Sequence, residues 1–165
     1  MEIFYYCSIS LATFGNWYEI NKRDPQEFVL RFFAFLNNYK NYSGKKVHQF
    51  LDEYLEQANK FKLSDLEAMK EEFVLTFAFT KKYFPDALHV YRKTKKQYEP
   101  VTRIKFESIA VGVALALREN PELAPHSISF LDSQQFRDFT KGDASSSQNK
   151  VTRRLEYVRD RLLDS

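Results

Sequence analysis

The chain has 165 residues, which favours a single domain, and 44% of them are hydrophobic, which is enough for a sizeable core. It combines 16 Phe and 10 Tyr with only 4 Gly and 5 Pro, and this composition favours long packed helices over a β fold with many turns. A net charge of +3 is too small to indicate nucleic-acid binding by itself, and a single cysteine, Cys7, excludes an internal disulfide and fits a reducing, cytoplasmic location.

The first 20 residues are apolar, and we expect residues 1–20 to form an N-terminal arm that packs on the helices. A signal peptide is the alternative, but Glu2 stands where such a leader carries positive charge. No apolar run reaches the ~20 residues that a bilayer span needs, so no membrane partner is expected. Residues 21–165 are predicted to form one helical domain.

The first predicted helix covers residues 25–39. Asp24 can cap its N-terminus, and Pro25 suits the first helical position, where no backbone donor is needed. Apolar side chains cover most of its circumference, so other elements must surround it. Arg31 is charged and lies in the middle of this apolar surface, and we expect it to pair with a carboxylate.

Two further helices are predicted before residue 85. The helix over residues 45–59 has apolar side chains at helical spacing on one face. Its other face is acidic, which could indicate a metal or acid-catalysis site but is more typical of a solvated surface. A capping box over residues 64–67 starts a long helix that Pro85 ends. The acidic face of the helix over residues 45–59 carries Asp52, Glu53 and Glu56.

Residues 81–105 form the most basic and least regular stretch, with eight Lys or Arg residues against two acidic ones, a local net charge of +6. Basic side chains can neutralise phosphates, and the interleaved tyrosines can stack on bases. The stretch is therefore a candidate nucleic-acid-binding segment, and a solvated connector is the alternative. The candidate residues are Lys81, Lys82, Arg92, Lys93, Lys95, Lys96 and Arg103, and the tyrosines are Tyr83, Tyr91 and Tyr98.

The helix predicted over residues 101–118 contains the run IAVGVALAL, which is apolar on all sides and rich in small residues. It is therefore predicted to be the central buried helix, which its neighbours can approach closely. A short helix is expected over 132–141 and a final one over 148–163. The arginines of the final helix could meet phosphates or form a solvated face. The fold class is thus predicted to be an all-α orthogonal bundle of five to seven helices.

No catalytic or metal site can be assembled from the sequence. Glycine clusters that could cradle a phosphate are missing, and the three histidines, His48, His89 and His126, lie in different segments without zinc-ligand spacing. Cys7 has no basic neighbour to lower its pKa. We therefore expect no catalytic residue, metal or cofactor, and favour a binding domain over an enzyme, although distant residues could still combine into a site.

Residues 21–42, NKRDPQEFVLRFFAFLNNYKNY, resemble a segment of the GmrSD-like family, also called domain of unknown function 262. The shared features are an arginine, a short acidic stretch, a "vLRFlaf" helix and closing tyrosines. The runs VHQFLDEYL and VTRRLEYVRDRL and the alanine-rich helix follow in the family's order, so the resemblance covers residues 21–165. The matching residues of the first segment include Arg23, Asp24, Glu27, Arg31, Tyr39 and Tyr42.

This resemblance implies the helical C-terminal half of a bacterial restriction protein that acts on modified phage DNA. The family's catalytic half is ParB-like and carries an Asp-Gly-x-x-Arg signature, which this chain lacks. The implied function is a non-catalytic accessory domain that contacts DNA or a partner protein, such as a ParB-like catalytic half. Arg23 and Arg31 could serve the site of a complete protein. The alternatives are a nuclease with a dispersed site and a protein-interaction domain without nucleic acid.

Overall fold

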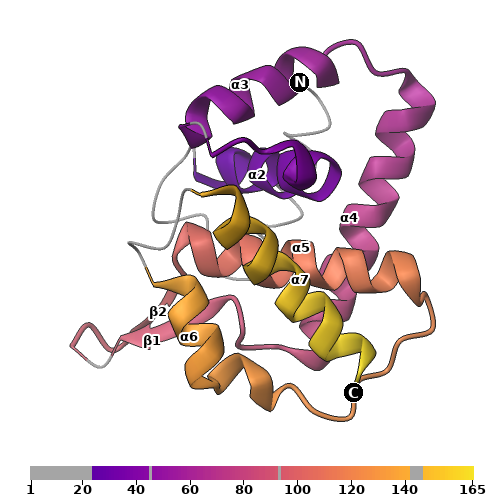
Figure 1. Ribbon diagram of the computed structural model, residues 1–165. Helices are drawn as coiled ribbons and strands as arrows, with labels where there is room; N and C mark the ends of the chain where they lie inside the picture. Colours follow the sequence, from indigo (N-terminus) through magenta and orange to yellow (C-terminus); the bar gives the residue numbers. More distant parts are fainter. Residues whose placement is uncertain (1–23, 45, 93, 142–146) are drawn as a thin grey trace.

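A computed structural model describes residues 24–44, 46–92, 94–141 and 147–165 of the chain (Figure 1). The arm predicted over residues 1–20 lies outside the described residues, as do Arg23 and Lys93. The described part is an all-α bundle with one small β-hairpin, and its six α-helices confirm the predicted fold class. The helices are α2 (Asp24–Asn38), α3 (Val47–Ala58), α4 (Leu63–Tyr83), α5 (Arg103–Glu119), α6 (Gln134–Thr140) and α7 (Gln148–Leu163). The remaining elements are the 3-10 helices η2 (Tyr39–Asn41) and η3 (Ser129–Asp132) and the strands β1 (His89–Arg92) and β2 (Gln97–Pro100).

Helix α5 is the centre of the bundle, as its small apolar residues predict. It packs against α2, α4, α6 and α7, and Figure 1 shows α2 above it and α7 lying across it. Thr102 caps its N-terminus by accepting a hydrogen bond from the backbone N–H of Lys105. The small side chains of α5 are buried, which lets the surrounding helices come close. These buried residues include Ala110, Gly112, Ala114 and Ala116.

Aromatic rings fill the space between α2, α4 and α5. The Phe32 ring of α2 lies 5.4 Å from that of Phe73 in α4, and Phe73 in turn lies 4.4 Å from Phe77. Phe77 stacks on Phe106 of α5, with ring centroids 6.0 Å apart. Such pairs add about 0.5–1.5 kcal/mol beyond the area they bury. Helix α2 is therefore enclosed by other elements, as its apolar circumference predicts.

Two local predictions differ from the structure. Helix α4 begins at Leu63, where the Asp65 carboxylate accepts a hydrogen bond from the backbone N–H of Lys62 at 3.1 Å, so its N-terminus lies two residues before the predicted box over residues 64–67. The basic stretch is not only a connector, because part of it pairs as the β1–β2 hairpin. Val and Tyr, which favour strands, occupy the middle of this hairpin.

Helices α5 and α7 approach each other closely at Gly112. A β-carbon at this position would lie 2.5 Å from Val158 Cβ and 3.0 Å from the Leu155 carbonyl oxygen. Real β-carbons do not approach other atoms so closely, and the backbone carbonyl cannot be moved by a side-chain rotation. The contact between α5 and α7 therefore requires glycine.

Gly112→Ala is consequently expected to lower the free energy of unfolding. Overpacking lowers the free energy of unfolding by about 1–3 kcal/mol, whereas the higher helix propensity of alanine raises it by about 1 kcal/mol at most. Urea denaturation followed by circular dichroism measures the difference. The exposed Glu56 of α3 serves as the control, because the difference in stability between its alanine and glycine variants reports the propensity effect alone. A higher denaturation midpoint for Gly112→Ala would contradict the close approach.

Candidate functional site

The β1–β2 hairpin projects from the body of the molecule at the lower left of Figure 1. Its strands run antiparallel, with His89 opposite Pro100 and Tyr91 opposite Tyr98. Lys96, in the turn that joins them, adopts a left-handed backbone conformation with φ 51°, as hairpin turns often require. The described residues of this turn, Thr94, Lys95 and Lys96, thus place two lysines at the far end of a narrow two-stranded projection.

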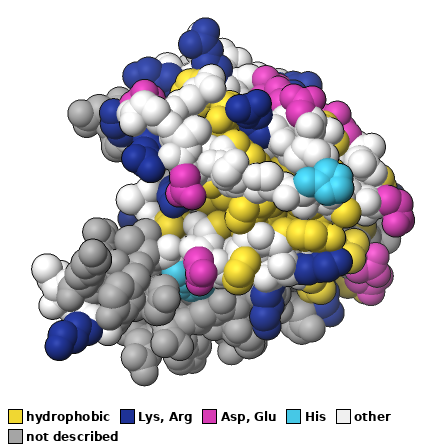
Figure 2. Space-filling model, turned by 90° about the horizontal axis from the view of Figure 1, so that it is seen from below, with side chains coloured by type: hydrophobic (Ala, Val, Ile, Leu, Met, Phe, Trp, Pro, Cys, Tyr) yellow, Lys and Arg dark blue, Asp and Glu magenta, His cyan; other side chains and the backbone are white. Residues whose placement is uncertain are grey.

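The structure divides the predicted basic residues among several elements. Lys95 and Lys96 lie in the hairpin turn and are exposed. Lys81 and Lys82 occupy the last turn of α4, also exposed. The backbone of Arg92 belongs to β1, and its side chain lies outside the described residues. From below, Figure 2 shows a basic side chain at the outer end of the hairpin, at the lower left.

Arg103, the last of these candidates, belongs to a different feature. It lies in the first turn of α5, where its Nε and Nη2 atoms donate to the two carboxylate oxygens of Glu27, at 2.9 and 3.2 Å. Glu27 also accepts from Arg31 Nε at 2.8 Å. Arg103 therefore contributes to the junction of α2 with α5, separately from the hairpin turn.

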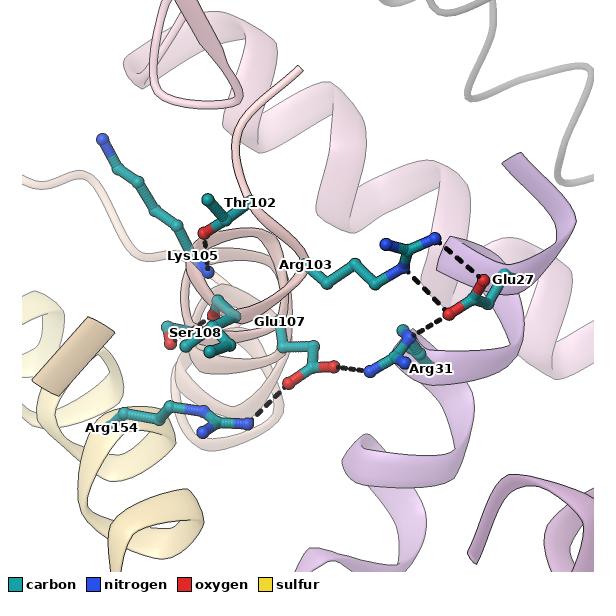
Figure 3. Close-up of polar contacts among 9 residues, drawn as sticks. Glu27, Arg31, Thr102, Arg103, Lys105, Glu107, Ser108 and Arg154 are labelled. Atoms are coloured by element: carbon teal, nitrogen blue, oxygen red, sulfur yellow. Dashed lines mark hydrogen bonds and ion pairs between the residues drawn. The ribbon is translucent and has the colours of Figure 1, made fainter. Parts of the chain in front are cut away.

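This junction continues into the core as a row of alternating charges (Figure 3). Arg31 Nη1 donates to Glu107 Oε1 at 2.5 Å, and Arg154 Nη2 of α7 donates to Glu107 Oε2 at 2.6 Å. We call Arg103, Glu27, Arg31, Glu107 and Arg154 the charge network. It joins α2, α5 and α7, which are far apart in the sequence.

The charge network becomes more buried from Arg103 towards Arg154. The side chain of Arg103 is 48% exposed, whereas those of Glu107 and Arg154 are 2% and 1% exposed. Burial alone would raise the pKa of Glu27, but the hydrogen bonds and positive charges of Arg31 and Arg103 bring it below its ordinary value. Burial would lower the pKa of Arg31, and the nearby charge of Glu107 raises it above its ordinary value. The shifted pKa values keep Glu27 and Arg31 charged at neutral pH.

The chemistry of the charge network is structural. A general acid or base near neutral pH needs a carboxyl group whose pKa is raised, whereas the pKa of Glu27 is lowered and both oxygens of Glu107 accept from arginines. A buried ion pair of this kind stabilises a particular arrangement of helices only when its hydrogen bonds are made. Arg31 thus pairs with two carboxylates inside the bundle.

The tyrosines that close the segment resembling the GmrSD-like family are also part of the packing. Tyr39 donates to the Glu156 carboxylate at 3.0 Å, and burial, with this hydrogen bond, raises the pKa of Tyr39 to about 12. Tyr42 packs its ring edgewise on Phe35, with centroids 5.6 Å apart. Both tyrosines therefore hold η2 and its neighbours together.

The acidic face of α3 does not form a metal site. Asp52, Glu53 and Glu56 are exposed, as is His48. Within the residues that the structure describes, no three His, Cys, Asp or Glu side chains gather closely enough to hold a metal ion.

Glu107 and Arg154 are buried, which the sequence pattern does not predict. The arginines of the final helix are predicted to form a solvated face or to meet phosphates, whereas Arg154 is buried against Glu107. Arg159 of the same helix does pair with Asp160, at 2.7 Å, as the solvated-face interpretation expects. The available signal is an acidic residue, Glu107, placed between Phe106 and the apolar run that starts at Ile109.

Comparisons with protein-family models, curated proteins and solved structures find no match to this chain. Among the helices described, none has both the length and the apolar content that crossing a membrane requires.

Proposed function

We propose that the chain is a non-catalytic helical accessory domain that contacts nucleic acid through the β1–β2 hairpin. The observation that carries the proposal is the projecting hairpin with two exposed lysines in its turn. The resemblance of residues 21–42 to the GmrSD-like family suggests a bacterial restriction system as the setting, with a ParB-like catalytic half as the protein partner.

The shape of the hairpin supports contact with a nucleic-acid groove. A two-stranded ribbon is narrow enough to enter the major groove of duplex DNA. Lysines at its tip would then meet phosphates, which supply affinity without sequence preference. The strands are only four residues long, so the contact is small and its affinity depends on charge.

The charge network supports a binding domain over a dispersed-site enzyme. Glu107 is the most deeply buried carboxylate described, and its two oxygens accept hydrogen bonds from arginines of two different helices. A hydrolase would need such a group to face a substrate. The proposed function therefore assigns no catalytic step to this chain.

The double variant Lys95→Glu/Lys96→Glu is expected to weaken binding to short duplex DNA strongly at low salt. Because each phosphate contact contributes about one to the slope of log K against log salt concentration, the variant slope should fall by about 2. Fluorescence anisotropy over a salt series, with duplex and single-stranded oligonucleotides, measures both quantities.

The matched control is Lys46→Glu/Lys60→Glu, which makes the same change of net charge at exposed positions at the two ends of α3. We expect the control to retain most of the affinity. Equal losses in both double variants would show an effect of net charge alone, and absence of binding by the unaltered chain at low salt would refute the nucleic-acid proposal.

A further inference from the structure

Helix α4 has one face in the core and one face in solvent. Met69, Phe73 and Phe77 lie on the buried side, together with Thr76 and Thr80. With 3.6 residues per turn, the residues on the opposite side form one straight stripe along the helix. We call this the α4 stripe, and its exposed residues are Ser64, Glu67, Ala68, Glu71, Val74, Leu75, Ala78 and Lys82.

The middle of the α4 stripe is apolar. Leu75 is 65% exposed and Val74 is 42% exposed, and among the described residues only Leu63, at the start of the same helix, is another large exposed hydrophobic residue. Ala78 lies beside them one turn later. The large apolar side chains that meet solvent are thus concentrated on one helix. Figure 1 shows that helix at the right-hand edge of the bundle.

Opposite charges flank this apolar centre. Glu67 and Glu71 lie on its N-terminal side, and Lys82 lies on its C-terminal side, where its ammonium group rests 4.7 Å from the centre of the Tyr83 ring. The stripe is acidic at one end, apolar in the middle and basic at the other end. It is therefore complementary to an identical stripe that runs in the opposite direction.

We infer that the α4 stripe binds the α4 stripe of a second copy of this chain, with the two helices antiparallel. A two-fold axis near Val74 and Leu75 places Val74 of one copy opposite Leu75 of the other. The same axis places Glu67 of each copy opposite Lys82 of the other. Every contact is therefore made twice, as the symmetry of a homodimer requires.

The composition of the stripe suits helix packing. Ala68 and Ala78 flank the larger Val74 and Leu75, and this alternation lets two helices approach closely. A helix of 21 residues is about 31 Å long, so the contact covers a single helix face and forms a reversible dimer. The charges favour a second copy, because the acidic end of one α4 stripe meets the basic end of an identical stripe, and they favour the antiparallel arrangement, because like ends would repel in the parallel one.

This inference is independent of the proposed nucleic-acid contact. The hairpin lysines, Lys95 and Lys96, belong to a different element from the α4 stripe. A chain that binds DNA but does not dimerise would refute only the dimer, and a chain that dimerises without binding DNA would refute only the nucleic-acid proposal.

Sedimentation velocity across a concentration series tests the inference on the full chain. We expect the mass of two chains at high concentration, and Leu75→Asp should raise the dissociation constant at least about tenfold. The control Gln49→Asp adds the same charge to an exposed position of α3 and should leave the dissociation constant unchanged. Circular dichroism checks that each variant is folded.

Charge reversal identifies the antiparallel pairing. Glu67→Lys and Lys82→Glu should each weaken the dimer, because each places like charges opposite one another twice. The double variant Glu67→Lys/Lys82→Glu restores opposite charges and should recover the original dissociation constant to within about threefold. The mass of one chain at every concentration, a dimer insensitive to Leu75→Asp, or a double variant no tighter than the single ones would each overturn the inference.

Discussion

Replacing Glu107 by alanine is expected to lower the free energy of unfolding by about 3–5 kcal/mol. Glu107 accepts from Arg31 at 2.5 Å and from Arg154 at 2.6 Å, and the Arg154 side chain is only 1% exposed. Removing the carboxylate takes a hydrogen-bonded negative charge away from the buried Arg154 guanidinium and leaves Arg31 with Glu27 as its carboxylate partner. Removing one partner of a buried pair therefore costs far more than the pair itself contributes.

Equilibrium denaturation in urea measures this loss. Glu27→Ala is the matched control, since Glu27 also bridges two arginines but its side chain is 35% exposed. Water can replace Glu27, so the control should lose about 1 kcal/mol or less. A Glu107→Ala variant that is no less stable than the control would show that the charge network does not hold the core together.

Ala114→Asp is expected to leave the chain largely unfolded. Ala114 lies in the middle of α5 and is 1% exposed, so an aspartate there would be buried in the core. A buried charge without a partner costs about 4 kcal/mol or more, and a domain of this size is stable by only about 5–15 kcal/mol. Circular dichroism and thermal denaturation report the outcome. The same replacement at Ala124, which is exposed in the loop after α5, should change stability by about 0.5 kcal/mol at most.

A soluble, cooperatively folded Ala114→Asp variant would contradict the central position of α5. That position is one that the sequence itself predicts, because a helix that is apolar on all sides must be surrounded. The prediction for α7 is equally direct, since its apolar spacing and polar preceding loop define a helix with the observed bounds, Gln148–Leu163. Strong periodicity and clear caps therefore made much of the fold predictable.

The hairpin and the buried acid were less predictable, for different physical reasons. Strands of four residues carry too few alternations to define a period, and their pairing depends on the turn between them. The partners in the charge network are separated by 76 residues for Arg31 and Glu107 and by 47 for Arg154 and Glu107. Local spacing contains no information about such pairs, so the sequence could suggest that Arg31 has a carboxylate partner without identifying it.

The charge network also determines how the bundle opens. Arg154 lies on α7, and its contact with Glu107 joins that helix to α5. If α7 detached alone, Glu107 would lose its hydrogen bond from Arg154 while α5 and α2 still enclosed the carboxylate. Such a partly opened state would have a high free energy. The three helices therefore behave as one cooperative unit, and their amide protons should exchange with solvent through a shared opening.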